Sequence, residues 1–322
     1  MTMTAFALMR GDAANPFDDF ATNDSLPVSS GRRRRERDIP PLSPRKETAR
    51  VVAIVVCVLS GAFFLQLTVI GSFQARAAQR QAFDRFRERL AFGTAPTSGA
   101  DEEGHLLALG TPIALLEIPA LGLKQIIGEG TTAGVLLDGP GHERDTVFPG
   151  QFGTSVIMGR RAGFGGAFSD IGSLKAGDDL NFTTAQGTFV YEVVGVRREG
   201  DVIPAVPAGS ARLILATAGG SAFVPNGVLR VDANLVGTPV VGVTPPFRSS
   251  NLPARERVMH NDTSTLWVLA FWLQVLLLFA LAAIWAWHRW GHIQAWIVFF
   301  PTLLFVGLAV SGEAARLLPN LL

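Results

Sequence analysis

Three long apolar runs constrain the fold of this 322-residue chain more than any other feature. The first two, Val51–Phe73 and Leu266–Trp287, contain no charged residue. Each can cross about 30 Å of hydrocarbon at about 1.5 Å per residue. The third, about Gln294–Val310, is interrupted by Pro301, which neighbouring helices can accommodate in a membrane. The sequence therefore predicts three transmembrane helices, at 51–73, 265–287 and 293–312, with a tail at 313–322.

Basic residues around the first apolar run predict how the chain is oriented. Eight arginines and lysines lie between Arg32 and Arg50, and a sparser group at Arg76–Arg89 belongs to a predicted helix. Positive charge favours the cytoplasmic side of a membrane, so we expect the N-terminus inside and Gln74–Thr263 outside. The basic cluster is also suited to contact anionic membrane lipid. With a net charge of +1 and three apolar runs, the chain is not expected to bind nucleic acid.

The composition divides the rest of the chain into segments. Residues 1–50 predict a disordered basic cytoplasmic tail, 74–109 a juxtamembrane helix and linker, and 237–264 a proline-rich tether. Between them, at 110–236, short apolar runs alternate with glycine and proline turns, which predicts an all-β closed barrel. The expected strands are Ala114–Ile118, Lys124–Gly128, Thr154–Met158, Asp179–Thr183, Phe189–Val196, Arg212–Ala216 and Val228–Leu235.

Six segments of this region occur in an order and at a spacing that match a known family. They are LEIPALG from Leu116, LDGPGH from Leu137, FPGQFGT from Phe148, VIMGRR from Val156, FSDIGSLKAGD from Phe168 and LILATA from Leu213. On these segments, over about 114–235, the chain resembles the sortases. These are the surface-protein transpeptidases of Gram-positive bacteria, and the actinobacterial class E type is the most similar. The resemblance implies a sortase-like barrel outside the cell membrane.

The resemblance also implies a catalytic His, Cys and Arg, and the sequence departs from the family at all three positions. Arg160 stands where the family has His, Ala218 where it has Cys, and Val228 where it has Arg. Arg230 lies two residues further along the same predicted strand, on the same face as Val228. The one cysteine of the chain, Cys57, lies in the first apolar run, away from any base, so it is not expected to be the nucleophile.

Alanine offers no nucleophile, and arginine cannot act as a base near neutral pH. The sequence therefore predicts a catalytically inactive sortase-like protein that binds a cell-envelope peptide or partner. The expected partner is a cell-surface protein, a sorting-signal peptide or an intact sortase.

Two alternatives remain open. One is a transpeptidase or hydrolase with a hydroxyl nucleophile at Thr217 or Ser221 and His142 as its base. The other is a membrane-assembly scaffold that acts through its transmembrane helices.

The candidate ligand groove consists of Arg160, Arg161, Thr217 and Arg230. If the guanidinium groups converge there, they favour a carboxylate or phosphate ligand; otherwise each points into solvent. A single cysteine allows no intramolecular disulfide, and no Cys/His cluster has the spacing of metal ligands. No metal and no cofactor are expected.

Overall fold

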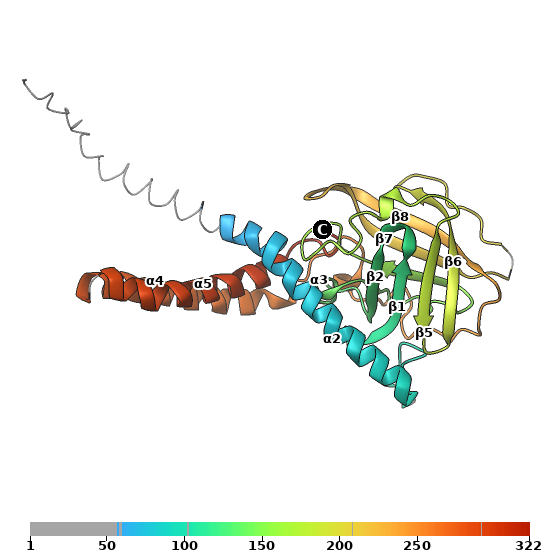
Figure 1. The fold of residues 1–322 in the computed structure, drawn as a ribbon, viewed down its shortest axis with the longest axis horizontal. Helices are drawn as coiled ribbons and strands as arrows, with labels where there is room; N and C mark the ends of the chain where they lie inside the picture. The colour runs from blue at the N-terminus through green and yellow to red at the C-terminus, as the bar shows by residue number, and fades with distance from the viewer. Residues whose placement is uncertain (1–56, 58–59, 102, 208, 291) are drawn as a thin grey trace, which may run out of the picture. The chain divides into compact units, whose positions relative to one another are not determined.

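The computed structural model describes residue 57 and residues 60–322, except 102, 208 and 291 (Figure 1). Eight strands among these residues form a closed barrel in the order β1-β2-β3-β4-β7-β8-β6-β5. The strands are β1 (Pro112–Ile118), β2 (Leu123–Glu129), β3 (Gly141–His142), β4 (Thr154–Met158), β5 (Asp179–Thr184), β6 (Gly187–Arg197), β7 (Arg212–Ser221) and β8 (Val224–Val236). The predicted closed barrel is confirmed, and each of the seven expected strands overlaps one of these eight.

The barrel interior is filled by alternate residues of the strands. Leu213 and Leu215 of β7 and Leu229 and Val231 of β8 are buried in one apolar cluster with residues of the other strands. The pairs β2–β3 and β4–β7 are parallel, and the remaining neighbours are antiparallel. Residues two apart on a strand share a face, so the intervening side chains of β7 and β8 point outward.

Two short elements between β2 and β4 were not predicted. Helix α3 (Ala133–Asp138) begins after Thr132, whose side chain accepts a hydrogen bond of 3.4 Å from the Val135 N–H. Strand β3 follows, and a Cβ atom at Gly141 would lie 2.2 Å from the Gly130 carbonyl oxygen. Only glycine fits so close to a neighbouring backbone.

A long helix precedes the barrel. The chain is helical from Ser60 to Phe92, with a π-helical segment η1 (Gln66–Ile70) before α2 (Gly71–Phe92), and it shows no break at the predicted membrane boundary near residue 73. Gly93, with a φ of 67°, follows α2. Helix α2 packs against the barrel beside β1 and β2 (Figure 1). Gln79 fixes this contact, because its amide bonds both the N–H and the carbonyl of Ile126, at 2.7 and 3.1 Å.

The prediction of three membrane helices is corrected to two candidates among the described residues. They lie at Thr263–Ala286 and Ile293–Arg316, within the elements η5 (Thr263–Thr265), α4 (Leu266–Arg289) and α5 (His292–Arg316). Pro301 lies inside α5 without ending it. Of the first predicted span, 51–73, residues 51–56, 58 and 59 lie outside the described residues, and residues 60–73 belong to the continuous helix above. Length and composition alone make α4 and α5 candidates for crossing a membrane.

Candidate functional site

Arg160, Ala218 and Val228, which the sequence singled out, lie near the ends of β4, β7 and β8. Ala218 of β7 pairs with Val228 of β8, and Met158 at the end of β4 pairs with Ala216. Arg160 follows β4 by two residues. Met158, Ala216, Ala218 and Val228 form one buried apolar cluster with Leu136 and Leu321. We refer to the surface made by Met158, Ala216, Ala218 and Val228 as the outer patch, because these side chains face away from the barrel interior.

Arg160 is the largest fully buried side chain among the described residues, with 1% of its surface exposed. Its Nη1 donates a hydrogen bond of 3.0 Å to the Leu322 carbonyl oxygen, and its guanidinium carbon lies 5.8 Å from the centre of the Phe164 ring. Nε and Nη2 have no hydrogen-bond partner among the described residues. Burial lowers the pKa of Arg160 from its ordinary value to about 10. The group is therefore still protonated at neutral pH and cannot serve as a general base.

The local fold fixes the position of Arg160. The Gly159 N–H donates 3.0 Å to the Ala216 carbonyl, which extends the β4–β7 pairing by one residue. A Cβ at Gly159 would lie 2.5 Å from the Phe168 ring, so a larger residue would push the chain away. The Phe168 N–H then donates 2.9 Å to the Arg160 carbonyl, which closes the loop after Arg160.

Two distant segments of the chain cover the outer patch. Leu321 is fully buried in its cluster, and Val258 and Met259 pack against the same cluster. The Leu321 carbonyl accepts a hydrogen bond of 2.9 Å from the Arg161 N–H. The predicted groove is therefore occupied by the chain itself, around the site of Ala218.

The two covering segments also bind each other. The side-chain amide of Asn320 donates to the carbonyls of Thr131 and Arg257, at 3.0 and 2.9 Å. Its backbone N–H donates 2.9 Å to the His260 carbonyl. One segment precedes α4 and the other follows α5, so they enclose the two apolar helices in sequence.

The other predicted groove residues lie on two different faces. Arg230 pairs with Ala216 and is partly exposed on the outer face, and Arg161 is also partly exposed. Thr217, in contrast, is fully buried and pairs with Leu229, which points into the barrel. Because side chains alternate along a strand, Thr217 lies on the opposite face from Ala218, and the structure separates it from the rest of the predicted groove.

His142 lies inside the barrel wall, with 1% of its surface exposed. Its Nδ1 lies 3.0 Å from Glu129 Oε2, and its Nε2 lies 3.0 Å from both the Val147 carbonyl and Thr146 Oγ1. The Thr146 hydroxyl donates its own proton to the Glu143 carbonyl, so Nε2 of His142 is the donor in these contacts. Both ring nitrogens are therefore engaged in holding the barrel together.

The strand register also separates His142 from the candidate hydroxyls. His142 pairs with Ile157, and Ile157 with Leu215. Ser221, which is exposed, is six residues beyond Leu215, or roughly 20 Å along the strand. Thr217 is two strands away from His142 and two residues beyond Leu215, or roughly 12 Å. Neither hydroxyl forms a hydrogen bond with His142 among the described residues.

A buried cluster of charged groups surrounds His142 and was not predicted. Arg144 lies between two fully buried carboxylates, with Nε 3.8 Å from Glu129 and Nη1 3.6 Å from Glu256. Desolvation raises the pKa of Glu256, which the Arg144 charge opposes. The cluster connects the barrel to the segment before α4. Nothing in the sequence indicates it, since Glu129 and Glu256 are far apart along the chain.

Glu143 is a second titratable group that the sequence did not single out. Desolvation and then the nearby Asp145 charge raise its pKa from 4.5 to about 7, while His142 and Arg230 lower it. Its backbone N–H donates 2.9 Å to the Val156 carbonyl of β4. The raised pKa of Glu143 comes first from its burial, and the Arg230 charge opposes that rise.

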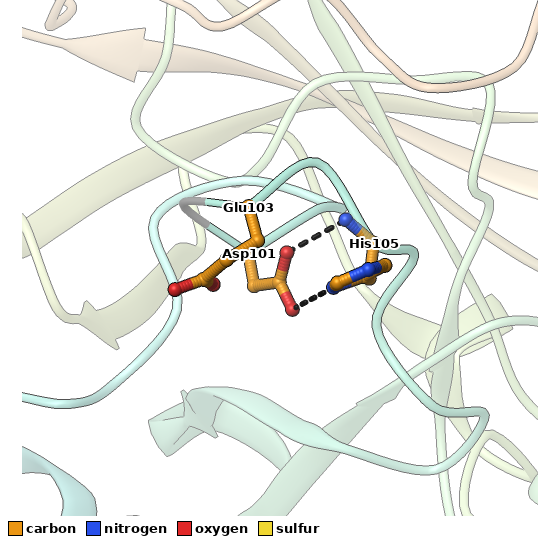
Figure 2. Close-up of side chains that lie close together, drawn as sticks. All are labelled: Asp101, Glu103 and His105. Atoms are coloured by element: carbon orange, nitrogen blue, oxygen red, sulfur yellow. Dashed lines mark hydrogen bonds and ion pairs between the residues drawn. The ribbon is translucent and has the colours of Figure 1, made fainter.

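Asp101, Glu103 and His105 bring three possible metal-ligand atoms within 4.8 Å of one another (Figure 2). Asp101 accepts a hydrogen bond of 2.6 Å from the His105 N–H and lies 3.4 Å from its Nδ1. All three side chains are exposed and belong to the segment read as a linker. These contacts are those of a local turn, and we assign no metal to it.

A sortase-domain family model matches residues 116–223. The chain carries a sortase-family domain. Among curated proteins, sortase D of Bacillus subtilis is 36% identical over 85 residues, which are 26% of this chain and 41% of that protein. This chain thus spans less than half the length of this relative.

Several solved sortase structures are similar to the chain. The Clostridium perfringens sortase D5 transpeptidase is 22% identical, with 50% of this chain and 99% of that chain covered at a TM-score of 0.39. Sortase E1 of Streptomyces coelicolor, solved with a tripeptide in its active site, is 24% identical, with coverages of 40% and 91% and a TM-score of 0.35. Sortase E of Streptomyces avermitilis is 27% identical, with coverages of 47% and 100% and a TM-score of 0.33.

Proposed function

We propose that this protein is a membrane-anchored sortase-like protein that performs no thiol transpeptidation and binds a cell-envelope peptide or partner. One observation carries the proposal: Ala218, Val228 and Arg160 lie together at the ends of three neighbouring strands. These are the positions that the sortase resemblance assigns to Cys, Arg and His. A site for acyl transfer needs a nucleophile, a base and an oxyanion donor.

The outer patch supplies neither a nucleophile nor a base. Its strand residues are apolar, and Arg160 is a buried cation. Cys57 lies in the helix before the barrel rather than among the patch residues. A thioacyl intermediate on this patch therefore has no atom on which to form.

Peptide binding is supported by the relatives and by the unused donors of Arg160. The Streptomyces coelicolor sortase E1 holds a tripeptide in its active site, and a Clostridium perfringens sortase C was solved with a C-terminal cell wall sorting motif. In this chain, Arg160 Nε and Nη2 are buried and free of hydrogen bonds among the described residues. Guanidinium donors of this kind suit carbonyl or carboxylate oxygens of a peptide.

Membrane anchoring is supported by the surfaces of α4 and α5. Large apolar side chains are exposed along both helices, and they include Phe271, Leu277, Leu281, Ile297, Leu304 and Phe305. Exposed apolar surface of this extent needs lipid or a partner to cover it. With the basic Arg32–Arg50 segment on the cytoplasmic side, the barrel lies outside the cell membrane.

The proposal is tested with a peptide-cleavage assay on labelled sorting-signal peptides. We expect no turnover by the native chain. We expect turnover, if it can be restored, in the Ala218→Cys, Arg160→His, Val228→Arg triple variant and not in the double variant that keeps Val228, because the groups of such a site act as a unit. Cys57→Ala in each protein excludes chemistry by that thiol.

Turnover by the native chain that survives Cys57→Ala would overturn the proposal. If that turnover is then lost in Ser221→Ala or Thr217→Ala, the hydroxyl-nucleophile alternative replaces it. Tight binding of the uncleaved peptide by the native chain would support the binding role.

A further inference from the structure

We propose that residues Pro319–Leu322 are an internal ligand of the outer patch, and that an extended peptide with a leucine-sized side chain binds there only when this segment leaves. The inference rests on the proposed binding function and adds to it both the ligand class and its regulation. It begins from the fact that the patch is occupied by the chain itself.

The side chain of Leu321 provides the apolar part of the contact. It is fully buried in the cluster that contains Ala216, Ala218 and Val228. Alanines at two successive outward positions of β7 leave room above the strand that a leucine fills. The patch therefore has the size and polarity to select an aliphatic side chain of this length.

The backbone of the segment provides the polar part. The Arg161 N–H donates 2.9 Å to the Leu321 carbonyl, and Arg160 Nη1 donates 3.0 Å to the Leu322 carbonyl. Both donors recognise backbone oxygens, which every peptide has, rather than a particular side chain. An external peptide with leucine in the same place can form the same two bonds.

Arg160 also has more donors than the segment uses. Nε and Nη2 are buried without a hydrogen-bond partner among the described residues. Since a buried polar group without a partner is costly, a ligand that offers further oxygen atoms gains an advantage over the internal segment. This makes displacement by a suitable peptide feasible.

Asn320 connects the internal ligand to the rest of the chain. Its side chain bonds the carbonyls of Thr131 on the barrel side and Arg257 on the segment before α4. The Asp262 N–H in turn bonds the Arg316 carbonyl at the end of α5, at 3.3 Å. Two residues, Leu317 and Leu318, separate α5 from the internal ligand, so a shift of the α5 end pulls directly on it. Occupancy of the patch is thereby coupled to the two apolar helices.

The test uses the full chain in detergent and a fluorescent Pro-Asn-Leu-Leu peptide, which copies the internal ligand. Deletion of residues 319–322 should raise the affinity for this peptide at least about tenfold, because apparent affinity scales with the fraction of open sites. The Pro-Asn-Asp-Leu peptide should not bind, since it replaces the leucine of the patch. Asn261→Ala, at an exposed position beside the covering segments, should leave the affinity at the native value.

The outcomes separate this inference from the proposed function. Equal affinity of the native and deleted chains, or no binding by either, overturns the internal ligand. Binding of the copy peptide by the deleted chain, together with no binding of sorting-signal peptides, supports the internal ligand and removes those peptides as the natural partner.

A second measurement applies if the deleted chain does not fold. In a Cys57→Ala chain, Ala218→Cys and Leu321→Cys place two thiols in one buried cluster, so a short bifunctional thiol reagent should join them. The control pair Ala218→Cys and Ser173→Cys should not be joined. Equal cross-linking of both pairs overturns the internal ligand. Protection of the first pair by an added leucine-containing peptide supports competition for one site.

Discussion

Replacing Arg160 by methionine should change the stability of the fold very little, although the side chain is fully buried. Desolvation lowers the pKa of Arg160 from its ordinary value to about 10, so keeping the side chain charged costs the folded state about 3 kcal/mol. Methionine has a similar length and no charge, so Arg160→Met removes this cost. The substitution also removes the stabilising free energy of the guanidinium's hydrogen bond to Leu322 and of its contact with the Phe164 ring.

Those gains are of the same size as the cost. One hydrogen bond from a charged donor to the Leu322 carbonyl contributes about 1.5–3 kcal/mol. The contact with the Phe164 ring at 5.8 Å contributes about 0.5–1 kcal/mol. The sum nearly cancels the desolvation cost, so we expect the free energy of unfolding to change by less than about 2 kcal/mol.

Thermal unfolding of the full chain in detergent, followed by calorimetry, measures this change. For a domain of this size, 1 kcal/mol corresponds to roughly 4 °C in Tm. The matched control is Arg161→Met, at a neighbouring, partly exposed arginine, which should also be nearly neutral. Removing one partner of a buried ion pair typically costs about 3–5 kcal/mol. A loss of that size in Arg160→Met alone would show that Arg160 neutralises a buried anion, and the balance above would be wrong.

Two further predictions concern pH and topology. Because the pKa of Glu143 is raised from 4.5 to about 7, the folded state holds more protons than the unfolded chain in that interval, and stability falls as pH rises through it. Glu143→Gln should reduce the loss of unfolding free energy between about pH 5 and pH 8 by at most about 3 kcal/mol, seen as a smaller fall in Tm; an unchanged pH dependence contradicts this. In a Cys57→Ala background, a membrane-impermeant thiol reagent on intact cells should label Ser173→Cys and not Ser25→Cys, and the reverse pattern would refute the proposed orientation.

The barrel could be predicted because each long strand has its own apolar run and its own turn. The strands β6 and β8, for example, contain the expected runs Phe189–Val196 and Val228–Leu235. Strand β3 has only two residues, Gly141 and His142, and its existence depends on β2 and β4 on either side. Such a strand has no periodicity of its own, so a reading of apolar patterns misses it.

The candidate site could be predicted only as far as its strand residues. The spacing of the sortase-like segments indicated Arg160, Ala218 and Val228, and the strand register brings their backbones together. Leu321 and Ala218 belong to one buried cluster although they lie more than a hundred positions apart in the chain. Composition predicted only a tail at 313–322, because nothing local distinguishes a buried Pro-Asn-Leu-Leu from an exposed one.

The same separation in sequence explains the error at Thr217. Its neighbours Ala216 and Ala218 both belong to the outer patch, and a position between them looks equally close to the site. A strand alternates its side chains, however, so the residue between two outward positions points inward. The resemblance gave the correct strand, but only the register with Leu229 shows which face Thr217 occupies.

The absence of the thiol and the presence of Leu321 are physically linked. A working cysteine site needs solvent access for its peptide and polar neighbours that stabilise a thiolate and a developing oxyanion. Covering such groups with leucine would bury them without partners, at a cost of several kcal/mol for a charged group. Alanine and valine at 218 and 228 carry no such cost, and both are buried in the same cluster as Leu321. A site that had merely decayed would gain nothing from donors aimed at Leu321 and Leu322, whereas Arg160 and Arg161 bond both carbonyls. Ala218, Val228 and the covering segment therefore fit together as one apolar surface, and the small apolar residues at these positions allow Leu321 to be buried there.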